Sequence, residues 1–470
     1  MKLKVPRIMI SAAGSNSGKT TVTAAVLKAL MLRGKRPASF KAGPDYIDPM
    51  FHSKVIKVPS RNLDKFMVGE NNCKYILGKN SINSDISIIE GVMGYYDGIG
   101  YGTSSSSYDL ALSLSCPVLL VINPDGMAAS VCAIIEGFKA FRKNSNICGV
   151  ILNNVSQAMY NYYKKIIEMN ADVKVYGYMP YLNDCRLESR HLGLVTAEEV
   201  GNLQAIVDEL GRQALCTVDL EGLIELAENS DCLEYEEPGI SFIGKTKIAV
   251  ANDKAFCFYY QDNLDLLKQM GAEIVSFSPM NDKKLPEGIG GLYIGGGYPE
   301  LHIEELSANK SMLWDINRKI NSGLPVFAEC GGYMYLMDSF TNMDGKSYSL
   351  AGAVKGNSYM TESLRRFGYI TLTSRNKNLM CGIGESINGH EFHYSDSTNT
   401  GDAFCAIKPE STRSWDAIIA DDTKFMGYPH INFLGNLKFA ENFIKKSCIY
   451  SGQYRDAESE RLQKAGKYEY

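Results

Sequence analysis

Short runs of apolar residues that end in loops alternate with helical patterns along the first half of the chain. The runs lie at residues 7–11, 85–90, 117–123 and 148–153. Continuous apolar runs of this length are typical of buried parallel strands. The stretches 20–33 and 127–142 carry apolar residues at helical spacing. The first half is therefore predicted to be an α/β doubly wound domain, with ligands gathered at the carboxyl ends of its strands.

The pattern changes near the middle of the chain. Residues 201–231 are helical and acidic, and residues 232–239 hold the charges and breaker residues of a linker. A second series of strand patterns then begins, at 247–251, 273–277 and 291–294. Two α/β domains are predicted, at 1–235 and 245–450, followed by a polar tail at 451–470 that has no apolar stripe to anchor a membrane.

Composition narrows the class of protein. Of 470 residues, 45% are hydrophobic and 22% charged, and the net charge is -4, which predicts a globular protein with no bulk attraction to nucleic acid. No apolar stretch near the N-terminus has the length of a secretory or membrane segment. The twelve cysteines are scattered and form no C-x-x-C pair. We therefore expect reduced thiols and a cytoplasmic location.

The first candidate site is a glycine-bearing turn between a predicted strand and a predicted helix. Backbone N–H groups at such a helix start face the phosphates of a nucleotide. Lys19 would neutralise the β and γ phosphates of ATP, and the Thr20 hydroxyl would ligate Mg²⁺. Ala13 stands where the usual motif has its first glycine. The predicted nucleotide contacts of this loop are Gly14, Ser17, Gly18, Lys19 and Thr20.

Acidic residues near other strand ends are candidate Mg²⁺ ligands. Glu90 ends an apolar strand and so lies at the predicted ligand edge of the sheet. Asp45 and Asp48 lie earlier in the chain, in a breaker-rich loop. A metal role and a plain surface loop are equally good interpretations of these two residues. The same two interpretations apply to Asp97, in a Tyr-Tyr-Asp-Gly turn.

The second candidate site is a cysteine turn. Cys330 lies at the sharp junction between a strand pattern at 324–328 and the start of a helix at Gly332, which is a nucleophile-elbow arrangement. The helix dipole is expected to lower the pKa of the thiol. The backbone N–H of Gly331 would receive an oxyanion, with a second donor from Gly296 and Gly297 in another glycine loop.

Thiol chemistry of this kind needs a base, and the chain has six histidines. His430 follows a short apolar run and precedes a helical stretch, as a base on a loop would. His390 and His393 lack metalloprotease spacing, and at least one of them is expected to be a structural histidine. Cys330 and His430 are therefore the predicted catalytic residues.

Together these motifs resemble the cobyrinate a,c-diamide synthase family, which are glutamine-dependent amidases of corrinoid biosynthesis. The resemblance spans nearly the whole chain. It rests on segments 17–21, 41–52, 62–64, 90–98, 189–194, 296–300, 329–336 and 389–395. It implies a P-loop, dethiobiotin-synthetase-like domain that binds ATP and the corrinoid. It also implies a class I glutamine amidotransferase domain of flavodoxin-like fold.

The resemblance also implies roles for single residues. Asp45, Asp48, Glu90 and Asp97 become candidates for metal or substrate contact, and Asn153 matches the place where related folds contact the adenine. Ordinary class I amidotransferases have a Glu two residues after the catalytic His, and here that position is Asn432. The cobyrinate branch is similar in lacking this Glu, so Cys330 and His430 would act as a dyad whose orienting group is open.

The implied partners are glutamine and a corrinoid, or related tetrapyrrole, that carries carboxylates, with a homodimer as one possibility. The implied reaction is amidation of the a and c carboxylates of cobyrinate through acyl phosphates, with ATP and Mg²⁺. One alternative is the amidation of nickel sirohydrochlorin in coenzyme F430 synthesis, and a more distant one is cobyric acid synthase. A partitioning-type P-loop ATPase would carry a signature lysine where this chain has Gly14.

The sequence leaves the central metal of the macrocycle open. It also leaves open which arginines meet the carboxylates of the macrocycle. Arg186, Arg190 and Arg365 are candidates, and surface ion pairing is the plain alternative for all three.

Overall fold

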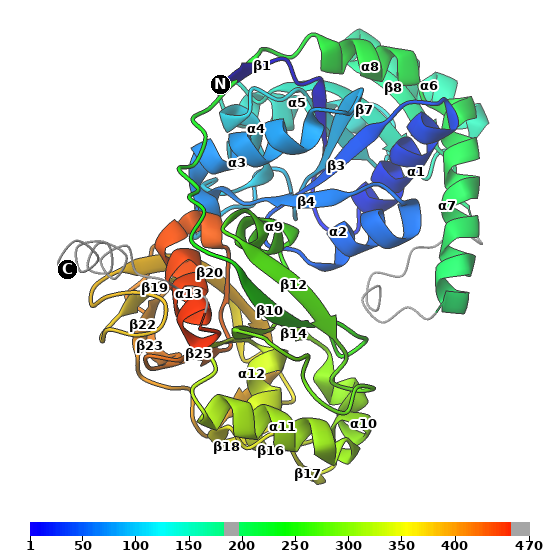
Figure 1. The fold of residues 1–470 in the computed structure, drawn as a ribbon. Coiled ribbons are helices and arrows are strands. Elements are labelled where there is room, and N and C mark those ends of the chain that lie inside the picture. The colour runs from blue at the N-terminus through cyan, green and yellow to red at the C-terminus, as the bar shows by residue number, and fades with distance from the viewer. Residues whose placement is uncertain (183–196, 453–470) are drawn as a thin grey trace, which may run out of the picture. The chain divides into compact units, whose positions relative to one another are not determined.

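The computed structural model describes residues 1–182 and 197–452, and it divides into two compact units (Figure 1). Unit 1 is Met1–Pro238 and unit 2 is Gly239–Tyr470. Three parts of the sequence analysis fall outside the described residues: most of the predicted polar tail, the segment 189–194, which includes Arg190, and Arg186. No helix in the described part of the chain is both long enough and apolar enough to cross a membrane.

Unit 1 is built on a seven-stranded sheet in the order β4-β3-β5-β2-β6-β7-β8, and every neighbouring pair is parallel. The strands are β2 (Arg7–Ala12), β3 (Pro37–Ala42), β4 (Ser60–Leu63), β5 (Ile86–Glu90), β6 (Val118–Ile122), β7 (Ile147–Asn153) and β8 (Lys174–Met179). A short antiparallel pair, β1 (Lys2–Leu3) with β9 (Leu233–Glu234), joins the two ends of the unit. The predicted parallel α/β sheet is confirmed.

Helices connect these strands, as parallel neighbours require a crossover. They are α1 (Lys19–Leu32), α2 (Ile47–Phe51), the π-helix η1 (His52–Ile56), α3 (Lys65–Ser81), α4 (Ser107–Ser113), α5 (Ser130–Phe141), α6 (Gln157–Asn170), α7 (Ala197–Thr217) and α8 (Leu220–Glu228).

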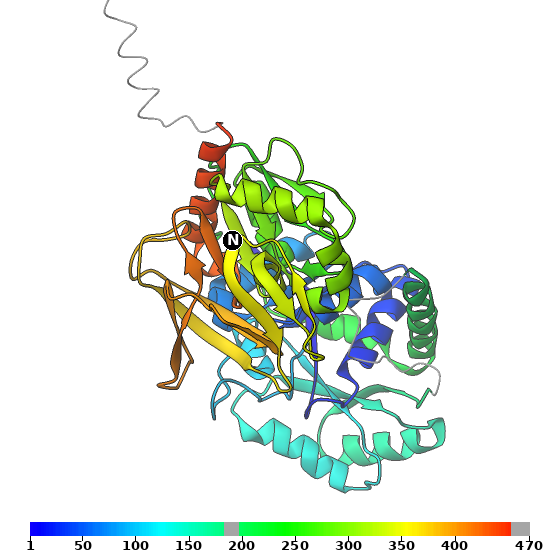
Figure 2. The same cartoon turned by 90° about the horizontal axis from the view of Figure 1, so that it is seen from below.

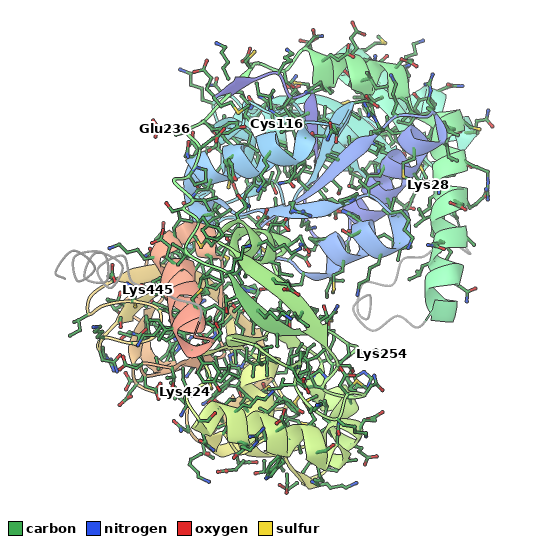
Figure 3. The ribbon with its side chains drawn as sticks, viewed as in Figure 1. Lys28, Cys116, Glu236, Lys254, Lys424 and Lys445 are labelled. Carbon is green, nitrogen blue, oxygen red and sulfur yellow. The ribbon has the colours of Figure 1, made fainter. Side chains whose placement is uncertain are left out.

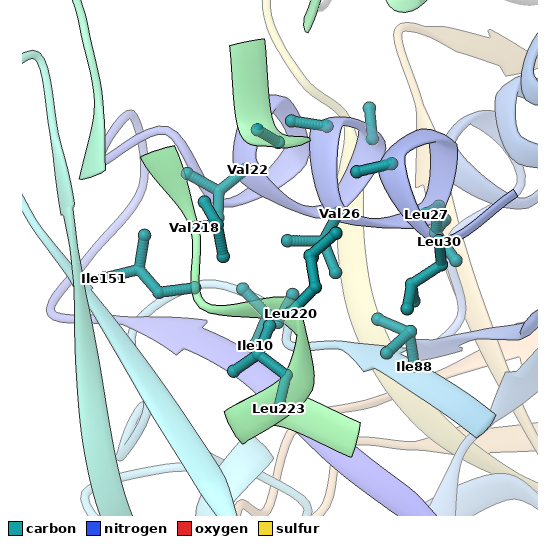
Figure 4. Close-up of a cluster of buried hydrophobic side chains, with 14 of the residues drawn as sticks. Ile10, Val22, Val26, Leu27, Leu30, Ile88, Ile151, Val218, Leu220 and Leu223 are labelled. Atoms are coloured by element: carbon teal, nitrogen blue, oxygen red, sulfur yellow. The ribbon is translucent and has the colours of Figure 1, made fainter. Parts of the chain in front are cut away.

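Helix α1 is apolar around most of its circumference because it is covered on two sides. Its Val22, Val26 and Leu30 belong to the same buried cluster as Ile10 and Ile88 of the sheet (Figure 4). Helix α7 covers the other side of α1. Burial of side chains of this kind contributes about 1.5–3 kcal/mol each, so this cluster fixes the start of α1 firmly on the sheet.

The outer edge of α1 carries charge. Lys28, labelled in Figure 3, forms an ion pair with Asp208 of α7 at 2.6 Å. Gly211 allows the close approach of the two helices, because a Cβ there would lie 2.4 Å from Cγ of Lys28.

Unit 2 has a six-stranded central sheet in the order β12-β10-β13-β15-β25-β24. Its first five strands are parallel, and β24 is antiparallel to β25. The strands are β10 (Thr246–Ala251), β12 (Ala272–Phe277), β13 (Gly291–Ile294), β15 (Val326–Glu329), β24 (Ile419–Ala420) and β25 (Lys424–Gly427). Its helices and short turns are α9 (Gln261–Gln269), η2 (Pro299–His302), α10 (Ile303–Ala308), α11 (Lys310–Asn321), α12 (Gly331–Leu336), η3 (Phe433–Gly435) and α13 (Leu437–Tyr450).

Unit 2 also contains sheets that the sequence analysis did not predict, one mixed and the others antiparallel, and the larger two are yellow and orange in Figure 2. One has the order β23-β22-β19-β20-β26, a second has the order β17-β16-β18-β21, and β11 pairs with β14. Their strands are β11 (Phe256–Phe258), β14 (Gly296–Gly297), β16 (Met337–Thr341), β17 (Ser347–Ser349), β18 (Val354–Met360), β19 (Arg366–Ser374), β20 (Ser386–His393), β21 (Ser395–Ser397), β22 (Phe404–Ile407), β23 (Ser414–Ala417) and β26 (His430–Ile431).

Candidate active sites

The phosphate loop lies between β2 and α1, as predicted from the sequence. Lys19 folds back over the loop: its Nζ donates to the carbonyl of Gly14 at 2.9 Å and to the carbonyl of Met93 at 2.6 Å. Burial, followed by repulsion from Lys41, lowers the pKa of Lys19 to about 8. The ammonium group is therefore held among carbonyl oxygens at the place where phosphate oxygens would replace them.

Any residue larger than glycine at position 18 would be strained. The φ of Gly18 is +91°, and a Cβ would lie 2.0 Å from Nδ2 of Asn153. That amide donates to the carbonyl of Ser17 at 3.2 Å, so the last residue of β7 is hydrogen-bonded to the loop. Ser17 itself donates its hydroxyl to the carbonyl of Gly14 at 3.0 Å.

The acidic end of β5 meets the start of α1. The Thr20 hydroxyl donates to Oε1 of Glu90 at 2.7 Å. Lys41 stands in register with Glu90 on the neighbouring strand β3, and its Nζ lies 3.1 Å from the same oxygen. The ammonium of Lys41 is also 2.5 Å from Oδ2 of Asp48 and 3.9 Å from Oδ2 of Asp45. The structure thus brings three of the predicted acids around one buried lysine.

The charges of this cluster are set by burial and by each other. Burial works against the carboxylate of Glu90, but Lys41, His52 and the Thr20 hydroxyl together outweigh it and lower the pKa of Glu90. Burial also works against the ammonium of Lys41, but Glu90 and Asp48 outweigh it and raise its pKa. For Asp48, burial together with the charges of Glu90 and Asp45 raises the pKa. Lys41 and Glu90 are therefore the charged pair, and Asp48 readily takes a proton.

Two of the predicted acids have bonds within their own turns. Oδ1 of Asp45 accepts from the N–H of Ile47 at 2.8 Å, and Oδ2 of Asp97 accepts from the N–H of Gly94 at 2.8 Å. The side chain of Asp97 is exposed. Both residues shape the loops that carry them.

Lys41 and His52 were not among the predicted site residues. His52 is fully buried, with Nε2 3.1 Å from Oε2 of Glu90 and Nδ1 2.8 Å from the Ser39 hydroxyl. Lys41 is the last residue but one of β3, just before the loop that carries Asp45, and a charged residue in a buried strand is the signal that could have pointed to it.

The residues around Glu90 fit a magnesium ion. Thr20, Asp48 and Glu90 offer the hard oxygen ligands that Mg²⁺ prefers. No group of three or more His, Cys, Asp and Glu side chains in the described ranges forms a metal site on its own. Mg²⁺ commonly takes one or two carboxylates together with substrate phosphates, so a nucleotide would complete the set.

The cysteine turn joins β15 to α12. Cys330 has φ 49° and ψ -108°, a conformation that few residues other than glycine adopt. Its backbone N–H donates to the carbonyl of Gly427 in the adjacent strand β25 at 2.7 Å. The neighbouring strands therefore hold the strained turn, which presents the half-buried thiol as in a nucleophile elbow.

The expected lowering of the thiol pKa was wrong for this state of the protein. Burial and, after it, the carboxylate of Glu300 raise the pKa of Cys330. Burial also raises the pKa of Glu300 itself, to about 7. Helix α12 has only six residues, and its dipole does not offset these two effects. The thiol rests in its neutral form.

His430 belongs to the short strand β26 and stands in register with His390 of β20. A Cβ at Gly296 would lie 2.6 Å from Cε1 of His430, and a Cβ at Gly331 would lie 3.4 Å from the backbone N of Gly297. The glycine loop thus touches both the histidine and the cysteine turn. Gly296 and Gly297 form β14, paired with β11, and their role as oxyanion donors stays a prediction.

The other two histidines of this region, and Asn432, have contacts of their own. Nδ1 of His393 lies 2.7 Å from the carbonyl of Ser395, and the His393 ring stacks on Tyr428. Burial lowers the pKa of both His390 and His393 to about 4. Asn432 accepts from the N–H of Leu434 at 3.0 Å. It therefore caps the turn that follows and supplies no carboxylate.

One of the three candidate arginines can be placed. Arg365 forms an ion pair with Asp396, which is the plain alternative considered for it. Arg186 and Arg190 lie outside the described ranges.

Comparison with known proteins first gives the class. Residues 8–195 match the CobQ/CobB/MinD/ParA nucleotide binding domain. Residues 247–437 match the CobB/CobQ-like glutamine amidotransferase domain. The phosphate loop falls in the first match and the cysteine turn in the second. Fold and sites together define a glutamine amidotransferase joined to a nucleotide-binding domain.

Full-length relatives then give the family. The chain is 42% identical to a cobyrinate a,c-diamide synthase of Clostridium tetani over 93% of this chain and 99% of that protein. Proteins of the same name from Caldanaerobacter subterraneus subsp. tengcongensis and Thermoplasma volcanium are each 39% identical. They cover 94% and 96% of this chain, and 98% and 99% of their own lengths. The chain belongs to the cobyrinate a,c-diamide synthase family.

Proposed function

We propose that this protein is an ATP- and glutamine-dependent ligase that converts the a and c carboxylates of cobyrinate to amides in cobalamin biosynthesis. The observation that carries the proposal is that one chain holds both sites. One is a phosphate loop followed by Thr20, whose hydroxyl donates to Glu90, and the other is a strained turn at Cys330. Relatives that match nearly the whole chain bear the name of this activity.

The synthetase site would make the carboxylate reactive. The γ-phosphoryl group of ATP passes to a carboxylate oxygen of the substrate, giving an acyl phosphate and ADP. Lys19 leaves the carbonyls of Gly14 and Met93 to neutralise the phosphates. Thr20, Asp48 and Glu90 would hold Mg²⁺, which when bound neutralises charge on the β and γ phosphates. Asp45 and Asp97 are proposed to contact the metal or the substrate, and Asn153 the adenine.

The glutaminase site would supply ammonia. His430 takes the proton of the Cys330 thiol, and the sulfur attacks the side-chain amide carbon of glutamine. Backbone N–H groups of Gly331 and of Gly296 or Gly297 would stabilise the oxyanion. His430 returns the proton to the leaving nitrogen, ammonia departs, and water hydrolyses the γ-glutamyl thioester to glutamate. Ammonia then displaces phosphate from the acyl phosphate, which leaves the amide.

Substrate choice is the test of this proposal. The purified full-length protein is given ATP, Mg²⁺ and glutamine with cobyrinate, hydrogenobyrinate or nickel sirohydrochlorin, and amide formation is followed by mass. We expect two mass changes of -1 Da with cobyrinate, one per carboxylate converted. Exclusive amidation of nickel sirohydrochlorin would replace the proposal with the coenzyme F430 alternative. ATP hydrolysis without amide formation on any macrocycle would favour a partitioning-type ATPase.

Two further expectations from the sequence stay predictions. Cell fractionation would check the cytoplasmic location, and light scattering of the purified protein would check the homodimer.

A further inference from the structure

Glu329, the residue just before Cys330, stands next to His430, the proposed base. Its Oε2 lies 4.0 Å from Nδ1 of His430, and both side chains are buried. Its Oε1 accepts from the backbone N–H of Ile431 at 2.9 Å, and its Oε2 accepts from the Tyr293 hydroxyl at 2.9 Å. One carboxyl group therefore bonds the backbone next to His430 and faces a ring nitrogen of the same histidine.

We propose that Glu329 is the positioning acid of the glutaminase site and replaces the Glu that is missing at Asn432. The proposal rests on the proposed function, because it assigns a partner to His430 within that reaction. The third member of the catalytic set then comes from the strand of the nucleophile and not from the strand of the base.

The two ring nitrogens of His430 support this assignment. Nδ1 faces Glu329, while Nε2 would lie 3.3 Å from a Cβ at Gly296. The Gly296–Gly297 loop also packs on the cysteine turn through Gly331. The base therefore presents one nitrogen to the carboxyl group and the other to the side of the loop that touches the nucleophile's turn. In acid–base–nucleophile sets, the acid orients the ring from the nitrogen that does not face the nucleophile.

The carboxyl group of Glu329 is the acid that the structure pairs with His430. Burial lowers the pKa of His430 well below its usual value, and the charges of His390 and His393 of β20 lower it further. A carboxylate at this place favours the imidazolium that forms when His430 takes the thiol proton. Glu329 is anchored by Tyr293 and by Ile431, so its orientation is set before glutamine binds.

The ionisation of Glu329 gives the proposal a measurable signature. Burial raises the pKa of Glu329 to about 8, while the Tyr293 hydroxyl and the Ile431 N–H lower it in part. The carboxylate form supports the imidazolium, so glutamine use rises as pH passes upward through the pKa of Glu329. Removing the Tyr293 hydroxyl takes away a donor to the carboxylate, and this raises the pKa and moves the rise to higher pH.

The test compares Glu329→Gln, Tyr293→Phe and the unchanged full-length protein. Each is assayed with ATP, Mg²⁺ and cobyrinate, once with glutamine and once with ammonium chloride, between pH 6 and 9.5. For Glu329→Gln we expect a fall in the glutamine-dependent kcat of about tenfold or more, with KM for glutamine within about twofold. The ammonium-dependent rate is expected to stay unchanged. The rise near pH 8 is lost in Glu329→Gln and moves upward in Tyr293→Phe.

Three results decide the matter. A glutamine-dependent kcat within twofold of the unchanged protein in Glu329→Gln would overturn the proposal. If Glu329→Gln also loses ammonium-dependent amidation, the Tyr293→Phe profile decides, and a rise at unchanged pH would overturn it. Cys330→Ser is run beside them: continued use of glutamine in that variant would refute the glutaminase assignment as such, which is a different failure from that of Glu329.

Discussion

Lys41 and Glu90 stand opposite one another in register on the parallel strands β3 and β5, with 3.1 Å between the ammonium nitrogen and Oε1 of the carboxylate. Both side chains are buried, so each charge depends on the other. The pair lies beside Thr20 and Asp48, where the proposed Mg²⁺ and nucleotide phosphates would bind.

Lys41→Met is expected to destabilise unit 1 by about 3–5 kcal/mol, because it leaves Glu90 buried without its cation. The loss is larger at pH 8 than at pH 5, since Asp48 has a raised pKa and takes a proton as pH falls. Urea unfolding at the two pH values measures it. Lys28→Met on α1 is the control, because Lys28 pairs at the surface with Asp208 and its loss costs about 0–1 kcal/mol.

Lys19→Ala is expected to abolish amidation with glutamine and with ammonium salts alike, because both need the acyl phosphate. Lys28→Ala, a lysine on the same helix away from the loop, keeps both activities. Retained ammonium-dependent amidation in Lys19→Ala would show that the phosphate loop is not needed to form the acyl phosphate.

Cys330→Ser is expected to lose glutamine-dependent amidation by at least about a hundredfold, since the serine hydroxyl is a far weaker nucleophile at this pH. Amidation with added ammonium chloride continues at the rate of the unchanged protein. The measurement is amide formation by mass with each nitrogen source. Joint loss of both activities would mean that the two sites are not separable.

Gly18→Ala is expected to lower stability by about 1–3 kcal/mol, because it places a side chain at φ +91° and against Asn153. Gly14→Ala is the matched control in the same loop: a Cβ there meets nothing within 4 Å. Thermal unfolding compares the two variants. The double variant Gly18→Ala with Asn153→Ala should recover the part of the loss that comes from the collision, and equal melting of all variants would contradict this account.

Glu300→Gln is expected to speed alkylation of Cys330 by iodoacetamide about three- to tenfold at pH 8. The charge of Glu300 raises the pKa of the thiol, so its removal enlarges the thiolate fraction. Below about pH 6 the difference disappears, because Glu300, with a pKa of about 7, is then neutral in the unchanged protein too. Peptide mass spectrometry follows Cys330 among the other cysteines. Glu304→Gln, at an exposed pair with Lys346, is the control.

Local patterns in the sequence were enough to find the parts of each site that depend on neighbouring residues. The strand, turn and helix around Lys19 and the strand–helix junction at Cys330 lie where the patterns predicted them. The four parallel strand patterns of the first half are confirmed as β2, β5, β6 and β7. The additional sheets of unit 2 were missed, because their strands are half-exposed and carry many polar residues, so no continuous apolar run marks them.

The sequence by itself determined the phosphate loop, the cysteine turn and the family, because each depends on residues a few positions apart. Only the tertiary structure decided which charged residues, far apart in the sequence, lie next to one another. Lys41 meets Glu90 because β3 and β5 are neighbours, and Glu329 meets His430 because β15 lies beside β25. The thiol pKa follows the same rule: a local dipole predicted that it would fall, but burial, which the whole fold creates, raises it.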